Sequence, residues 1–204
     1  MAPPTAAAAA VTPTADPVTL KEKLIATWGV LCVSLLLGQA LVRLTPLALE
    51  PFEGEGLTLP LLVVYAVWVV FNAYAEGWRG FHLKFSPRVV ARAFYLGRNP
   101  RPLWIVLALP FCMSLFHSTK RQKIVSWVFL TVLVAVIVAV RSLPQPWRGI
   151  IDGGVVVGLG LGLGSVLYFW VKGLLGSPPP VTDLPDQAPS PSPTDLPDLP
   201  AALS

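Results

Sequence analysis

The chain has 204 residues, of which 54% are hydrophobic and only 13% are charged. Soluble domains carry about 25% charged residues, so the composition excludes an ordinary water-soluble globule and predicts a membrane protein. The net charge of +4 does not indicate a nucleic-acid partner, because the basic residues gather beside apolar runs, as the positive-inside rule predicts.

Five uncharged apolar runs account for the hydrophobic excess, and none alternates in polarity as the strands of a membrane barrel do. A spanning helix needs about 20 apolar residues, so four runs are long enough and the third is short. In chain order the runs are residues 24–42, 57–75, 103–116, 124–140 and 153–171. The sequence therefore predicts an all-α integral membrane protein with a bundle of four transmembrane helices.

The third run is expected to be a short re-entrant or interfacial segment. Its 14 residues would extend about 21 Å as a helix, and Pro110 in its middle removes a helical hydrogen bond. Five spans remain the alternative, because the uncharged window widens to residues 102–119 if His117 is neutral.

The basic residues favour four spans with both tails in the cytoplasm. In that topology only Arg43, Arg141 and Arg148 lie outside. The other twelve lie inside, which is the stronger asymmetry of the two arrangements: Lys21, Lys23, Arg79, Lys84, Arg88, Arg92, Arg98, Arg101, Lys120, Arg121, Lys123 and Lys172.

Both ends differ in composition from the transmembrane domain, which we assign to residues 21–176. Residues 1–20 are rich in alanine and proline, and residues 177–204 are acidic and rich in proline. Such segments cannot bury enough apolar surface to offset the entropy of ordering, so we expect two disordered tails.

The polar segment between the second and third runs predicts a basic helix that lies on the membrane surface. Ser86 and Pro87 suit a helix start, and Gly97 suits its end. Apolar residues recur on one side of this stretch. The expected lipid-facing basic residues are Arg88, Arg92 and Arg98, which would meet anionic headgroups. Docking of a protein partner on this helix is the alternative.

Just before this segment, Asn72, Glu76 and Arg79 form a candidate polar site at the cytoplasmic end of the second helix. Asn72 and Glu76 are one helical turn apart, and Glu76 can pair with Arg79 at i,i+3. Ionisable groups near the bilayer core are functional candidates. A structural ion pair in the interfacial belt and a site for a substrate or partner both remain open.

The last apolar run contains a glycine ladder, Gly154, Gly158 and Gly162, at i, i+4 and i+8. Small residues in this register let another helix backbone approach closely. We expect a packing face, either within the chain or between chains. The same glycines could instead line a narrow path or permit bending.

No catalytic, cofactor or metal signature stands out, so we expect no cofactor and lean against an enzyme. The two cysteines lie inside apolar runs and indicate neither a disulfide framework nor a zinc site. His117 and Met113 would share a helical face at i,i+4 as a conceivable haem or metal pair, whereas His82 falls in the basic loop.

These features predict an accessory, assembly or scaffolding subunit of a bacterial-type inner membrane, acting through helix packing and a basic cytoplasmic face. Expected partners are anionic lipids and either another protein or a second copy. The alternative is a small transporter or channel with its path between the glycine-rich helix and the Asn72 and Glu76 end of the second helix. A haem-binding or redox protein is a weaker alternative.

Overall fold

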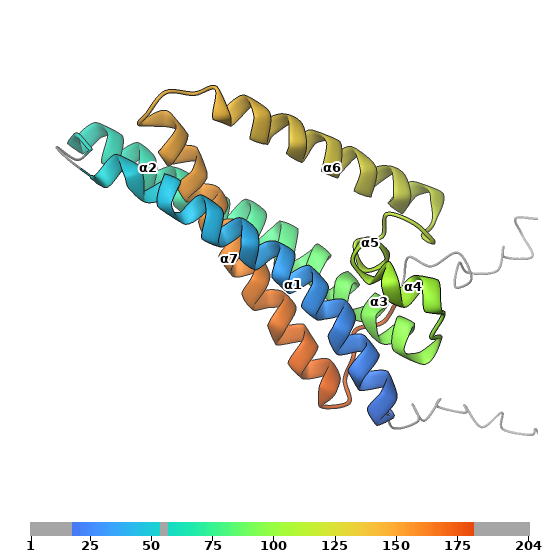
Figure 1. Ribbon diagram of the computed structural model, residues 1–204. Coiled ribbons are helices and arrows are strands. Elements are labelled where there is room, and N and C mark those ends of the chain that lie inside the picture. The colour runs from blue at the N-terminus through green and yellow to red at the C-terminus, as the bar shows by residue number, and fades with distance from the viewer. Residues whose placement is uncertain (1–17, 54–56, 182–204) are drawn as a thin grey trace, which may run out of the picture.

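The computed structural model describes residues 18–53 and 57–181, and every regular element in these two ranges is helical (Figure 1). Four stretches are long and apolar enough to cross a membrane, which confirms the expected helix class. They are Leu20–Phe52, Leu59–Arg98, Lys120–Arg141 and Trp147–Leu174. Almost all of both expected tails lies outside the described residues.

The first stretch is the helix α1 (Leu20–Leu49) with a short 3-10 turn η1 (Glu50–Phe52) at its end. The side chain of Thr19 accepts a hydrogen bond of 3.3 Å from the backbone N–H of Glu22. This contact satisfies one of the free donors at the helix start, and the carboxylate of Glu22 complements the helix dipole.

The second stretch is one continuous helix built from α2 (Leu59–Asn72), η2 (Ala73–Phe85) and α3 (Ser86–Arg98). The middle part, η2, is a π-helix of 13 residues. Such wide helices are rare, are mostly single turns, and often mark functional sites. The polar segment after the second apolar run is therefore helical from its beginning and is not a loop.

Pro87 marks the point where the wide helix returns to α-helical geometry. Proline has no backbone N–H and cannot continue the i to i−5 hydrogen bonds of η2, but it is tolerated in the first turn of an α-helix. The expected helix over residues 86–98 is present as α3, although it continues the preceding helix and does not start afresh.

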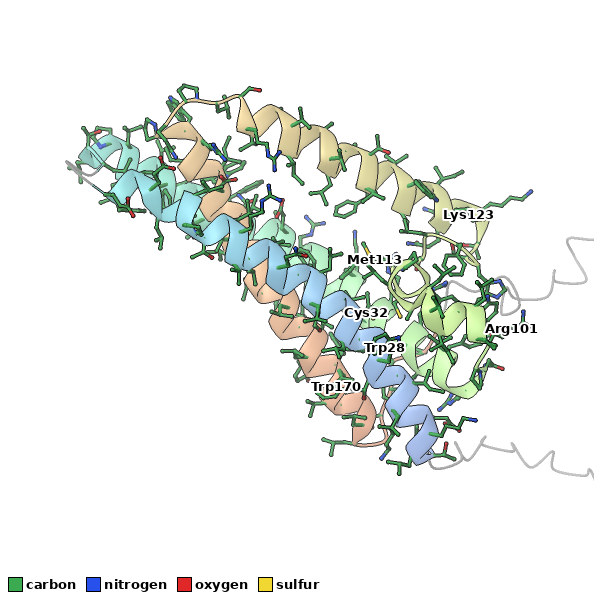
Figure 2. The ribbon with its side chains drawn as sticks, viewed as in Figure 1. Trp28, Cys32, Arg101, Met113, Lys123 and Trp170 are labelled. Carbon is green, nitrogen blue, oxygen red and sulfur yellow. The ribbon has the colours of Figure 1, made fainter. Side chains whose placement is uncertain are left out.

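The bundle is organised around α7 (Trp147–Leu174), which packs against α1, α2, η2 and α3. Trp170 Nε1 donates a 3.2 Å hydrogen bond to Thr27 Oγ1, near the start of α1. Figure 2 labels Trp170 on α7 and shows the course of α1 beside it. The buried core lies where α1, α3 and α7 meet, with Val33, Val90 and Val166 fully or almost fully buried.

The third apolar run forms no spanning helix. It folds into two short helices, α4 (Pro102–Val106) and α5 (Ala108–Cys112), followed by turns. In these turns Ser114 and His117 have positive φ angles of 60° and 49°, which side-chain-bearing residues adopt rarely. The α5 helix packs against α1 and α3.

The third stretch, α6 (Lys120–Arg141), has no buried residue and contacts α7 only sparsely. Figure 1 shows it to one side of the other long helices. In Figure 2, Lys123 at its beginning lies at the same end of the molecule as Arg101, just before α4.

Candidate functional site

A row of polar side chains on the second long helix faces the glycine-rich part of α7. We call this row the polar seam. It begins in the middle of α2, runs through η2 and ends at the start of α3. Its members are Tyr65, Trp68, Asn72, Glu76, His82 and Ser86, opposite Gly153, Gly154, Gly158, Gly162 and Ser165.

The first part of the seam bonds to backbone carbonyl groups. The Tyr65 hydroxyl donates to the Ala48 carbonyl oxygen at 3.3 Å, and Trp68 Nε1 donates to that of Ile151 at 3.4 Å. Within an apolar bundle a polar group without a partner is costly. These two bonds therefore let large polar side chains lie against α7.

Asn72 and Glu76 continue the seam opposite the glycine ladder. Asn72 is 3% exposed, and its Nδ2 donates to the Trp68 carbonyl oxygen at 2.9 Å. A Cβ added at Gly154 would lie 2.6 Å from Asn72 Nδ2, and one at Gly158 would lie 2.9 Å from Glu76 Oε2. Both glycines thus stand where the second helix closely approaches α7 of the same chain.

Arg79 does not join this arrangement. Its side chain is exposed, and no ion pair with Glu76 forms among the described residues. The reason is the helix type. A π-helix has more residues per turn than an α-helix, so the i,i+3 positions that would pair Glu76 with Arg79 no longer share a face. Asn72 and Glu76 stay together on the α7 side. The expected Glu76–Arg79 ion pair is absent.

The seam also contains a contact that the sequence did not predict, between His82 and Ser165. His82 Nδ1 lies 3.0 Å from Ser165 Oγ, and the imidazole stacks on Trp78 with ring centroids 4.5 Å apart. Placing His82 in a basic loop was wrong, because η2 continues the helix through it. The sequence feature that could have predicted a continuous helix here is the absence of proline between Leu61 and Ser86.

At the end of the seam, the helices remain in close contact. A Cβ added at Gly162 would lie 2.6 Å from the ring of Phe81. The hydroxyl of Ser86 donates weakly to the Gly162 carbonyl oxygen at 3.5 Å. All three ladder glycines therefore face the second helix. The loss of stability expected when one of them is enlarged stays a prediction.

Arg92 corrects the expectation of a lipid-facing basic helix. Its side chain is completely buried, and its guanidinium donates to three carbonyl oxygens after α4: Nε to Phe111 at 2.6 Å, and Nη2 to Phe116 and His117 at 3.0 Å each. The guanidinium carbon also lies 4.4 Å from the Phe111 ring centroid. Arg92 therefore holds residues 108–119, which comprise α5 and the turns after it and which we call the α5 turn segment. Its side chain does not face lipid.

The other two arginines of α3 are nearer the surface. Arg88 Nε donates to the Lys84 carbonyl oxygen at 2.6 Å. Arg98 is exposed, and its Nε lies 3.9 Å from the Glu22 carboxylate. These two locations permit contact with lipid headgroups, and lipid binding by Arg88 and Arg98 stays a prediction. The α3 helix as a whole packs in the bundle because α1 covers Ala93 and Gly97.

The conceivable metal pair is not supported by the backbone. Met113 and His117 lie in turns, and His117 has a left-handed conformation, so the two residues share no helical face. The His117 ring instead packs beside Trp104, with centroids 4.5 Å apart. No group of three His, Cys, Asp or Glu residues that could hold a metal occurs within residues 18–53 and 57–181.

Comparison with protein families, curated proteins and solved structures found no match for the chain. The polar seam is closely packed along α7, and its surface edge carries the exposed charged side chains of Glu76 and Arg79. This edge is the chemically distinctive part of the molecule.

Proposed function

We propose that the protein is a multi-pass accessory or assembly subunit of a bacterial-type inner membrane, which binds another membrane protein through the exposed edge of η2. The observation that carries this proposal is the depth of the charged side chains of Glu76 and Arg79 relative to the apolar run of α7. Glu76 lies beside Gly158, and His82 lies beside Ser165. Both α7 residues belong to the apolar run 153–171.

A membrane that covers this apolar run would also surround Glu76 and Arg79. Placing an arginine at the centre of a membrane helix costs about 2.5–3.5 kcal/mol, and lipid chains offer no hydrogen bonds to offset that cost. A partner helix with polar or charged side chains would satisfy both groups. Exposed charges at this level therefore support protein binding better than burial in lipid.

The arrangement of the helix ends supports a cytoplasmic face for the basic residues. The starts of α1 and α6 and the ends of α3 and α7 carry Lys23, Lys123, Arg98 and Lys172. With four spans these ends share one side of the membrane. The α4 and α5 helices, which do not span, would lie at this interface, where exposed basic side chains bind anionic lipid headgroups.

A transport path along the polar seam has less support. No room for such a path is left between Glu76 and α7, because a Cβ added at Gly158 would lie only 2.9 Å from Glu76 Oε2. The close packing of the seam favours a structural and binding role for this interface.

The test is native mass spectrometry of the protein extracted from its own membranes in mild detergent. We expect a complex whose mass is not a multiple of the chain mass. The double substitution Glu76→Gln and Arg79→Gln should release the partner, whereas the control Arg121→Gln, an exposed residue at the start of α6, should not. A complex that survives the double substitution unchanged would refute binding through this edge.

A further inference from the structure

The chain reverses its direction after α7. Gly176 has a φ of 97°, a backbone conformation that suits glycine. The N–H of Ser177 donates to the Lys172 carbonyl oxygen, and that of Gly176 to the Gly173 carbonyl oxygen, each at 3.1 Å. This pair of bonds is the Schellman pattern that ends a helix and turns the chain. Figure 1 shows the following segment running back toward α3 and α4, and Val181, the last described residue, packs against the buried core.

The sequence that follows Val181 carries all of the acidic side chains after α7. Four aspartates stand in two copies of Thr-Asp-Leu-Pro-Asp, residues 182–186 and 194–198, which we call the acidic units. Residues 182–204 contain no lysine or arginine. An extended chain spans at most about 3.3–3.6 Å per residue. Asp186 can therefore reach groups within about 17 Å of Val181, and Asp195 those within about 48 Å.

The end of the molecule with α4 and the start of α6 has an excess of positive charge. Four exposed side chains there form what we call the basic patch: Arg101, Lys120, Arg121 and Lys123. Figure 2 shows Arg101 and Lys123 at this same end.

The described part of the chain offers the basic patch no counter-charge. No ion pair joins a patch residue to a carboxylate within residues 18–53 and 57–181. The carboxylate of Glu22 lies at this end of the bundle, but its neighbour is Arg98, at 3.9 Å. The acidic units are therefore the counter-charges that the chain itself has available for the patch.

The units also match the surface around the patch in apolar character. Each unit places a leucine and a proline between its two aspartates. The guanidinium carbon of Arg101 lies 4.3 Å from the Trp104 ring centroid, and the neighbouring Leu103 is 67% exposed. A positive charge here stands beside apolar surface, which is the complement of an acidic unit.

We propose that residues 182–198 bind the basic patch of their own chain and shield it from anionic lipid headgroups. A segment joined to its own binding surface has an effective concentration on the order of millimolar, which favours it over a separate acidic protein. Ion pairs between exposed groups are individually weak, so anionic headgroups at a membrane can displace the segment. The proposal rests on the four-span topology, which puts both groups on one side, and not on the partner contact at η2.

The test is carbodiimide cross-linking of the full chain in a neutral detergent without added lipid. The reagent joins a carboxylate to a lysine amine in contact with it through an amide bond, and mass spectrometry maps the products. We expect the aspartates of the acidic units to be linked to Lys120 and Lys123 at least threefold more than to Lys172. Lys172 is exposed and nearer along the chain, so a segment that does not bind the patch would reach it at least as often.

Isotope labelling and lipid addition separate the other occupants of the patch. An equal mixture of labelled and unlabelled chains should give no mixed cross-links, because the contact lies within one chain. Adding phosphatidylglycerol should lower the cross-linking to Lys120 and Lys123 at least threefold, whereas phosphatidylcholine should not. Predominantly mixed products, cross-links to Lys172 at equal frequency, or cross-linking that phosphatidylglycerol leaves unchanged would each overturn the proposal.

Lysine acetylation by a water-soluble reagent gives a second measurement that needs no cross-link. Replacing all four aspartates of the acidic units by asparagine should raise the acetylation rates of Lys120 and Lys123 at least threefold. The rate at Lys172 and the thermal unfolding of the bundle should stay unchanged. The control Ser190→Asn and Ser192→Asn alters the same segment without its charge and should change no rate. Equal rates in the aspartate variant and the wild type would refute shielding of the patch.

Discussion

His82 and Ser165 are 83 residues apart in the chain, yet His82 Nδ1 lies 3.0 Å from Ser165 Oγ across the interface between η2 and α7. The imidazole is packed between Trp78 and Phe169, with ring centroids 4.5 and 5.2 Å away. Because its ring is enclosed by aromatic neighbours, His82 has a fixed orientation. The pair thereby specifies the register of η2 against α7.

We expect this pair to contribute a small and measurable coupling energy. Hydrogen bonds between membrane helices average about 0.6 kcal/mol in double-mutant cycles. A cycle with His82→Gln and Ser165→Ala, followed by unfolding in mixed detergent micelles, should give a coupling near that size. Coupling indistinguishable from zero would show that the two groups are neighbours without a stabilising bond.

Enlarging a ladder glycine should damage the bundle, whereas enlarging an open glycine should not. Gly158→Leu would place its Cβ 2.9 Å from Glu76 Oε2, while the position of Gly160 is open to more than 4 Å. Overpacking costs about 1–3 kcal/mol. Thermal stability in detergent should fall for Gly158→Leu and stay unchanged for Gly160→Leu. Equal stability of the two variants would remove the packing role of the ladder.

Replacing Arg92 should loosen the α5 turn segment. Arg92→Met leaves the carbonyl oxygens of Phe111, Phe116 and His117 without this donor, and hydrogen bonds from a charged group contribute about 1.5–3 kcal/mol each. Limited proteolysis should therefore cut residues 113–119 much faster than in the wild type. Lysine at position 92 should rescue little, because it lacks the planar fork of donors.

The matched control for Arg92 is Arg98→Gln. The contact of Arg98 with Glu22 is 3.9 Å long and exposed, and such pairs contribute about 0–1 kcal/mol. Proteolysis of residues 113–119 should then stay at the wild-type rate. If Arg98→Gln and Arg92→Met accelerate cleavage equally, the buried hydrogen bonds of Arg92 are not what holds the segment.

Cys112 should resist thiol reagents until the protein unfolds. Its side chain is 1% exposed, and burial raises the pKa of the thiol to about 12. Only the thiolate reacts, and at pH 8 about one thiol in 10,000 is ionised. Iodoacetamide labelling of Cys112, mapped by mass spectrometry, should stay low from pH 7 to pH 9 and become complete in denaturant. Extensive labelling of Cys112 at pH 9 or below in the folded protein would contradict this burial.

The proposed topology can be tested with single cysteines in the chain that lacks Cys32 and Cys112. Glu53→Cys, after η1, should react with an impermeant maleimide in intact cells. Lys120→Cys, at the start of α6, should react only after the membrane is permeabilised. Reaction of Lys120→Cys in intact cells would favour the five-span arrangement.

The sequence predicted the features that depend on composition and run length. Four apolar runs of sufficient length gave four helices of spanning length, and the short third run with Pro110 gave two short helices. Both outcomes follow from the length that a helix needs to cross lipid.

The register between distant helices could not be predicted. Whether Glu76 pairs with Arg79 or faces α7 depends on η2 being a π-helix, and nothing in the residues 73–85 alone requires that geometry. Arg92 has the sequence neighbours of a surface residue. It is buried because α1 and the α5 turn segment fold over α3, which is a contact between distant parts of the chain.

The central position of α7 also has a consequence for how the chain is made. A ribosome synthesises α1, α2, η2 and α3 before α7, although α7 contacts all four of them. Until α7 emerges, Trp68 and His82 lack the hydrogen-bond partners that they have in the finished bundle. The helices α1 and α3 also contact each other directly, but the side chains that face α7 stay without these partners until α7 is inserted, so assembly completes only after most of the chain has been translated.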